Sequence, residues 1–198
     1  MNSLSKNMGM SGWRVGYAIA HRKVINQLLK LNQHLITCAP TVLQDYMAEH
    51  FDDILSYTIP QAIAIAKKRK QVQAMMDELG IQTIEGVGTF YFMIDVSTFV
   101  GTTEELIYDL LINHNIATVP GRAYGESTKR FIRFGIGVES LEDIKKCLRI
   151  IKEYLVLDQY DNSGIQDFYS VHPNKSECVP VRAKNNSVYC RQQSAHSE

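Results

Sequence analysis

Residues 3–17 read Ser-Leu-Ser-Lys-Asn-Met-Gly-Met-Ser-Gly-Trp-Arg-Val-Gly-Tyr and place a lysine, serine hydroxyls, three glycines and an arginine within fifteen residues. Hydroxyls and backbone donors in a tight loop can bind the oxygens of a phosphate group, and a guanidinium can bind two oxygens together. An amine that attacks an aldehyde must be available in its neutral form, which a position beside such a site can favour. The stretch therefore predicts a site for a phosphate-bearing cofactor around Lys6.

The apolar pattern that follows predicts a strand at residues 13–20 and helices at residues 21–35, 41–51 and 60–79. The last of these helices is the longest, with Pro60 in its first turn and Gly80 just past its end, where helices prefer these residues. It carries four consecutive basic residues at positions 67–70. We interpret this basic run as the solvated face of a long helix.

Further along, strands are predicted at residues 88–96, 116–119 and 130–134. Thr102 with Glu105 makes a capping box, and Ser140 with Asp143 predicts a second helix start. Helices and strands that alternate between glycine turns are typical of an α/β fold. From about residue 157 the apolar pattern fades, so residues 157–198 are predicted to be a poorly patterned tail.

The bulk composition points away from charged macromolecular partners. Lys and Arg number 21, as do Asp and Glu, so the balance of charge gives no reason to expect nucleic acid or an anionic membrane surface. No apolar stretch is long enough to span a bilayer, and the first residues lack the apolar core of a signal peptide. The four cysteines form no C-x-x-C pair and the histidines supply no zinc-ligand spacing, so we expect no metal, reduced thiols and a cytoplasmic protein.

The pattern S-L-S-K-x-x-G-M-x-G-W-R-V-G resembles the pyridoxal-phosphate attachment motif of class I/II aminotransferases, most closely that of the aspartate, aromatic and alanine branch. The resemblance continues in three later segments, which are the aromatic strand at residues 88–92, the Pro-Gly loop at residues 120–125 and an arginine-bearing strand at residues 131–134. Tyr124 takes the place of the usual phenylalanine in that loop. The similarity covers roughly residues 3–155.

The resemblance implies a role for each matching residue. Lys6 would hold pyridoxal 5′-phosphate as a Schiff base and then move a proton as a general acid and base. Ser3 and Arg14 match the family's phosphate ligands, and Ser5 is a weaker candidate for the same cluster. Arg133 matches the arginine that binds the substrate α-carboxylate with two hydrogen bonds.

Three further residues, Tyr91, Tyr124 and Arg122, lie in segments that approach the substrate in relatives. For each of them, a place in the core or on the loop surface is an equally good interpretation. We therefore leave these three residues outside the predicted site.

In fold, the resemblance implies the C-terminal part of a fold type I transferase. Residues 1–60 would be the end of the large cofactor domain, and residues 61–156 the linking helix and the small α/β domain. Complete relatives carry roughly as much chain again before the lysine, including an aspartate that pairs with the pyridine nitrogen. Without that carboxylate the cofactor is a poorer electron sink, so we expect the chain alone to be inactive.

The implied function is amino transfer from an amino acid to a 2-oxo acid, in a complete protein that is a homodimer. Two alternatives stay open at this point. One is another pyridoxal-phosphate enzyme of the same fold, such as a lyase, a decarboxylase or a synthase. The other is the aminotransferase-like sensor domain of a transcription regulator. All three share the lysine and arginine motifs, so the sequence does not separate them.

Overall fold

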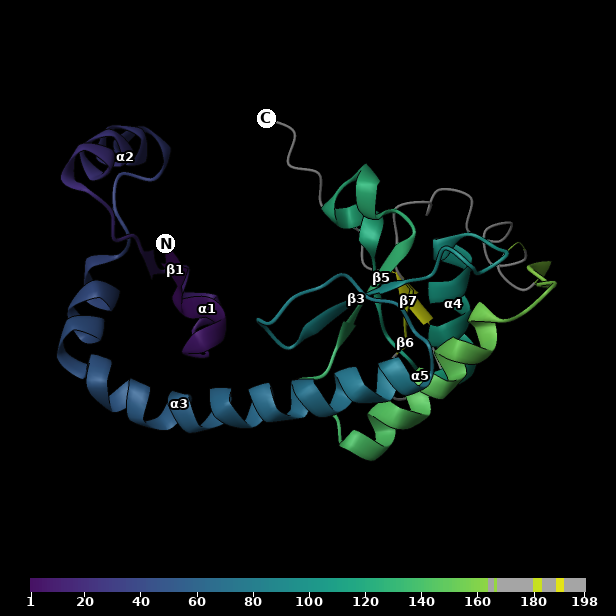
Figure 1. The fold of residues 1–198 in the computed structure, drawn as a ribbon. Coiled ribbons are helices and arrows are strands. Elements are labelled where there is room, and N and C mark those ends of the chain that lie inside the picture. The colour runs from purple at the N-terminus through teal and green to yellow at the C-terminus, as the bar shows by residue number, and fades with distance from the viewer. Residues whose placement is uncertain (164–165, 167–179, 183–187, 191–198) are drawn as a thin grey trace. The chain divides into compact units, whose positions relative to one another are not determined.

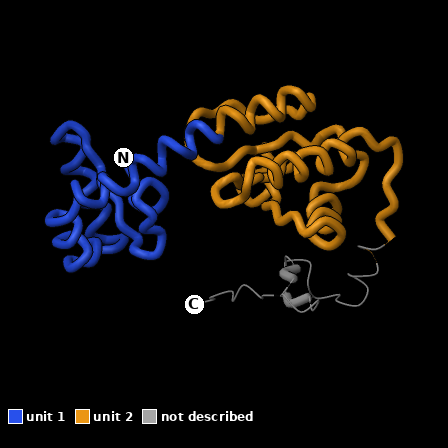
Figure 2. Tube along the Cα trace, turned by 90° about the horizontal axis from the view of Figure 1, so that it is seen from below, with its two compact units in different colours: residues 1–68 blue, residues 69–198 orange. Residues whose placement is uncertain are grey.

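The computed structural model describes residues 1–163, 166, 180–182 and 188–190 of the chain. The chain divides into two compact units, Met1–Lys68 and Arg69–Glu198, drawn in separate colours in Figure 2. The predicted domain boundaries after residues 60 and 156 stay predictions. The predicted tail at residues 157–198 lies mostly outside the described residues, apart from its first part and two short paired strands, β6 (Pro180–Arg182) and β7 (Val188–Cys190).

The first unit begins with a small closed loop. Strand β1 (Asn2–Ser3) pairs antiparallel with β2 (Gly16–Tyr17), and between them lie the one-turn helix α1 (Leu4–Asn7) and the 3-10 turn η1 (Ser11–Trp13). A Cβ atom on Gly16 would stand 2.7 Å from the carbonyl oxygen of Asn2, so this close pairing requires glycine. The predicted strand at residues 13–20 is therefore wrong in length, because Arg14 adopts a left-handed conformation that ends any extended run.

Two helices complete the first unit. Helix α2 (Arg22–Leu35) confirms the predicted helix, although its apolar residues are exposed or half-buried. Helix α3 (Thr41–Glu78) consists of two helices joined across a kink at His50, whose backbone is not helical. The predicted end of the first helix at residue 51 lies next to this kink, whereas the predicted start of the second at residue 60 is wrong, because Pro60 lies inside the helix. Ile54 and Leu55 pack against the small core of this unit, and that burial holds the intervening segment in the helix despite the proline.

The second unit is built on a three-stranded antiparallel sheet (Figure 1). Strand β5 (Phe131–Gly135) lies between β3 (Tyr91–Asp95) and β4 (Val119–Pro120). Alternate residues of β3 and β5 are buried, and they pack with the end of α3 and with helices α4 (Thr103–His114) and α5 (Leu141–Leu155). The opposite face of the sheet, which carries Arg133, is only half-buried. One side of the sheet thus faces the core, and the other side is partly exposed.

Local sequence signals correctly predicted the starts of helices α4 and α5. The Thr102–Glu105 capping box is present, and the Ser140 hydroxyl accepts a hydrogen bond from the Asp143 amide as predicted. Strand β3 starts later than predicted, since Thr89 has a φ of 63° and its hydroxyl accepts a hydrogen bond from the Tyr91 amide. That turn keeps residues 88–90 out of the sheet.

The interpretation of the basic run as a solvated helix face is wrong for Arg69. Its side chain is buried, and its two terminal nitrogens donate to the carbonyl oxygens of Tyr91 at 2.6 Å and Gly86 at 2.7 Å. The guanidinium carbon also lies 3.9 Å from the centre of the Phe92 ring. Burial lowers the pKa of Arg69, which is the expected direction for a desolvated cation. The three lysines of this run, in contrast, are exposed or half-buried.

Replacement of Arg69 by methionine is expected to destabilise the second unit by about 2–3 kcal/mol, because two carbonyl groups lose a charged donor. Lys70→Met is the matched control, since Lys70 is the exposed neighbour on the same helix. Urea unfolding followed by circular dichroism measures both variants. Equal unfolding midpoints for the two variants would contradict a stabilising role for Arg69.

The described part of the chain shows neither a membrane-spanning helix nor a metal-binding cluster of side chains. No helix there combines the length and the apolar content needed to cross a bilayer. No cluster of three or more His, Cys, Asp or Glu side chains has the arrangement of a metal site within the same residues.

Candidate cofactor and carboxylate sites

Lys6 lies on helix α1, inside the closed loop of the first unit. Leu4 and Met8 of this segment are buried against Met47 of α3, whereas the Lys6 side chain is exposed. The Leu4 amide donates to the carbonyl of Val15 at 3.1 Å, which closes the loop beneath the helix. Burial of its two apolar neighbours therefore orients this turn and keeps the lysine outside the core.

Ser3 is the N-cap residue of the same helix. Its hydroxyl oxygen accepts a hydrogen bond from the Ser5 amide at 3.2 Å, which leaves the hydroxyl proton available to donate to an anion. Ser5 itself is half-buried. Strand pairing sets Ser3 opposite Gly16, two residues beyond Arg14.

Arg14 lies on the same loop with an exposed side chain. One terminal nitrogen donates to the carbonyl of Ser11 at 2.8 Å, and a guanidinium has further N–H donors that this bond does not use. The loop thus carries a hydroxyl, an amine and a guanidinium. This donor set fits a cofactor that bears both a phosphate and an aldehyde, because the hydroxyl and the guanidinium suit the phosphate and the amine suits the aldehyde.

Arg133 occupies the centre of the sheet in the second unit. In the register of the strands it lies opposite Met93 of β3 and Val119 of β4. Its guanidinium carbon is 4.4 Å from the centre of the Tyr91 ring and 5.4 Å from the centre of the Tyr124 ring. Among the described residues, no carboxylate forms an ion pair with it. The Arg133 guanidinium therefore lies against two aromatic rings.

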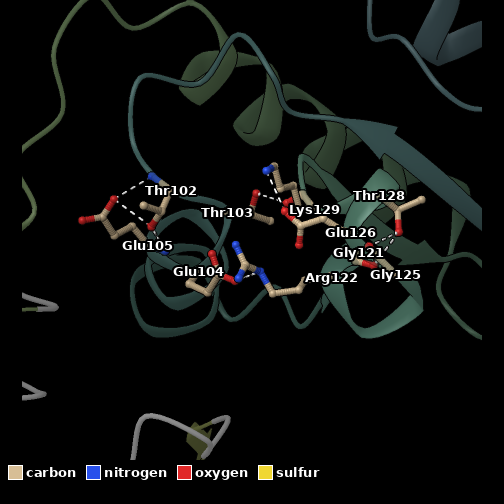
Figure 3. Close-up of polar contacts among 10 residues, drawn as sticks. All are labelled: Thr102, Thr103, Glu104, Glu105, Gly121, Arg122, Gly125, Glu126, Thr128 and Lys129. Atoms are coloured by element: carbon tan, nitrogen blue, oxygen red, sulfur yellow. Dashed lines mark hydrogen bonds and ion pairs between the residues drawn. The ribbon is translucent and has the colours of Figure 1, made fainter.

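The loop that carries Tyr124 is attached to the start of helix α4 (Figure 3). Arg122 forms an ion pair with Glu104 at 3.5 Å, and the Thr103 hydroxyl donates to the carbonyl of Lys129 at 2.8 Å. At the far end of the loop, a hydrogen bond from Lys129 lowers the pKa of Glu126. The loop is therefore held at both of its ends.

The same loop is closed internally by Thr128. Its hydroxyl lies 2.7 Å from the carbonyl oxygen of Gly121 and 3.0 Å from that of Gly125 (Figure 3). A Cβ atom on Gly121 would stand 2.1 Å from the carbonyl oxygen of Thr128, so no other residue fits this position without a shift of the backbone. Gly125 has a φ of 132°, a conformation that other residues rarely adopt.

Residues 1–151, which include both groups of residues, match the family description Aminotransferase class I and II. The chain belongs to this family. The match confirms the resemblance that was inferred from the lysine motif and the later segments. It also accounts for the mixed helix and sheet structure as the C-terminal part of an α/β aminotransferase fold.

Among characterised relatives of this aminotransferase chain, a (5-formylfuran-3-yl)methyl phosphate transaminase of Methanocaldococcus jannaschii is 31% identical over 156 residues. That alignment covers 78% of this chain and 41% of the relative. An aspartate aminotransferase of Pyrococcus abyssi is 26% identical, with 75% of this chain and 40% of the relative covered. The chain thus spans about 40% of the length of these relatives.

Solved structures agree on the fold. A crystal structure from Methanococcus jannaschii, described as similar in its active site to kynurenine aminotransferases, is 31% identical with a TM-score of 0.60. It matches 77% of this chain, which corresponds to 40% of its own. The family and the fold class are confirmed, whereas the roles of Lys6, Ser3, Arg14 and Arg133 stay predictions.

Proposed function

We propose that this chain is the C-terminal part of a pyridoxal-phosphate-dependent aminotransferase that moves an amino group from an amino acid to a 2-oxo acid. The observation that carries the proposal is the closed loop of the first unit, which presents Ser3, Lys6 and Arg14 together. The relatives reported above are a transaminase and an aminotransferase, which favours amino transfer over the lyase, synthase and regulator alternatives. We further propose, from the family resemblance alone, that the complete protein is a cytoplasmic homodimer.

Each of the four site residues has a distinct task in this proposal. Ser3 and Arg14 bind the cofactor phosphate, the first as a neutral donor and the second as a cationic fork. Lys6 would hold the cofactor aldehyde, and its amine would serve as the acid and base that moves a proton to and from the substrate Cα. Arg133 binds the substrate α-carboxylate. The cofactor, when bound, supplies the electron-withdrawing ring that makes the Cα proton removable.

Borohydride trapping tests the cofactor site. The 198-residue chain is incubated with pyridoxal phosphate, reduced and digested, and the labelled lysines are quantified by mass spectrometry. Lys6 is expected to be labelled at least about tenfold more than Lys30, an exposed lysine of α2, because charge-assisted hydrogen bonds to the phosphate favour the first site. Pyridoxal, which has no phosphate, is the matched probe. It should label both lysines alike, and equal labelling by pyridoxal phosphate as well would overturn the proposed site.

The chain tested alone is expected to show no amino transfer. It spans about 40% of its relatives, so most of the protein that they place around the cofactor is not supplied by these residues. Incubation with L-aspartate, 2-oxoglutarate and pyridoxal phosphate, followed by detection of glutamate, measures this. Glutamate formation above the rate of free pyridoxal phosphate would contradict the expectation.

A further inference from the structure

Arg133 has two aromatic neighbours that come from different parts of the second unit. Tyr91 belongs to strand β3, and Tyr124 belongs to the 3-10 turn η2 (Gly121–Tyr124). Both rings lie within cation–π distance of the guanidinium, at 4.4 Å and 5.4 Å. We call the Tyr91 and Tyr124 rings the aromatic clamp.

The place of Tyr91 follows from the strand register. Tyr91 lies opposite Gly135, and Met93 lies opposite Arg133, so Tyr91 is the diagonal neighbour of Arg133 on the same face. A Cβ atom on Gly135 would be 3.8 Å from two carbon atoms of the Tyr91 ring. The ring therefore lies over the glycine, and the small residue opposite it leaves room for this position beside the arginine.

The place of Tyr124 follows from its loop. The Arg122–Glu104 ion pair and the Thr103 hydrogen bond to Lys129 tie the loop to helix α4, and Thr128 closes it from within. Tyr124 is 50% exposed and belongs to neither hydrophobic core cluster among the described residues. Its contact with Arg133 is thus set by the backbone of the loop more than by core packing.

We propose that Tyr91 and Tyr124 are positioning residues that hold the Arg133 guanidinium ready for a carboxylate, an inference that rests on the proposed function. A guanidinium attracted to ring faces keeps the N–H groups at its edge available, since those groups lie in its own plane. A flexible arginine would have to be ordered when the carboxylate binds. The clamp orders it beforehand, and the substrate class that it favours is a carboxylate bound through two parallel hydrogen bonds.

The experiment uses nuclear magnetic resonance of the arginine Nε–Hε groups in the full chain, with the Arg133 signal identified by its loss in Arg133→Lys. Propionate is the probe, because it is a carboxylate without a carbonyl that could react with lysines, and sodium chloride at equal ionic strength is the blank. The variants are Tyr124→Leu, which removes the ring, and Tyr124→Phe, which retains it. Tyr57→Leu is the control, because Tyr57 is an exposed tyrosine of the first unit.

In Tyr124→Leu the Arg133 Hε signal is expected to move toward the position of an unstacked arginine, and the affinity for propionate to fall about three- to tenfold. Tyr124→Phe and Tyr57→Leu should keep both properties close to those of the unsubstituted chain. Loss of affinity in Tyr124→Phe as well, or an Arg133 signal unchanged in Tyr124→Leu, would overturn the clamp. A chain whose Arg133 signal does not respond to propionate at all would also overturn it, while the labelling of Lys6 would still decide the proposed function.

Discussion

Replacement of Lys6 by alanine is expected to remove the selective pyridoxal-phosphate label from the chain completely. Only a neutral amine can attack the cofactor aldehyde, and alanine has no nucleophile. The remaining lysines should then be labelled at the level of Lys30, which is exposed on helix α2. Reduction with borohydride and quantification of the labelled peptides measure the change. The expected effect is the largest available in the first unit, because it removes the reacting atom itself.

Two further variants distinguish the contribution of the Lys6 amine from that of its positive charge and of the neighbouring phosphate donor. Lys6→Arg keeps the positive charge but provides no neutral amine, so it should lose the label as fully as Lys6→Ala. Arg14→Leu keeps the amine and removes a phosphate donor, so Lys6 should still react but with about tenfold lower selectivity over Lys30. Selective labelling of the loop that persists in Lys6→Ala would show that another residue holds the cofactor.

Gly121→Ala is expected to destabilise the second unit by about 2–4 kcal/mol. The added methyl group would stand 2.1 Å from the Thr128 carbonyl oxygen and 2.6 Å from that of Phe131. Both obstacles are backbone atoms, which cannot rotate away as a flexible side chain would, so the strand or the loop must shift. The free energy of unfolding in urea, followed by circular dichroism, measures this effect.

Gly88→Ala is the matched control for this substitution. A Cβ atom on Gly88 meets no atom within 4 Å, so the change should alter stability by less than about 1 kcal/mol. Gly121→Ala should also displace Tyr124 and weaken its contact with Arg133, which the Arg133 Hε signal would report. If both glycine variants unfold at the same urea concentration, the close approach at Gly121 does not exist in solution.

Much of the fold could be predicted because its signals are local. The capping residues Thr102 and Ser140 marked the starts of α4 and α5 through hydrogen bonds that span three residues. The error at Pro60 has a physical origin of another kind. A proline is a local signal for a helix start, but the second part of α3 already begins just after the kink at His50, where Ile54 and Leu55 pack against the core of the first unit.

The candidate site residues also include some that the sequence predicted and some contacts that it did not. Lys6, Ser3 and Arg14 lie within one short loop, so the motif by itself predicted that they act together, and the β1–β2 pairing is what closes that loop. The sequence left open whether Tyr91 and Tyr124 belong to the site, and it did not predict their contact with Arg133. A tyrosine on a strand and a tyrosine on a loop carry no sign of the residue that they contact.

The sequence alone was enough to identify the family of this chain, to predict Lys6 as the cofactor-binding lysine and to place the caps of the later helices, since each depends on short motifs. The burial of Arg69 against β3 and the contacts of Arg133 with the Tyr91 and Tyr124 rings became visible only in the tertiary structure. These contacts join segments that are distant along the chain. Strand register and loop closure set them, and both result from the packing of the whole unit rather than from any short pattern of residues.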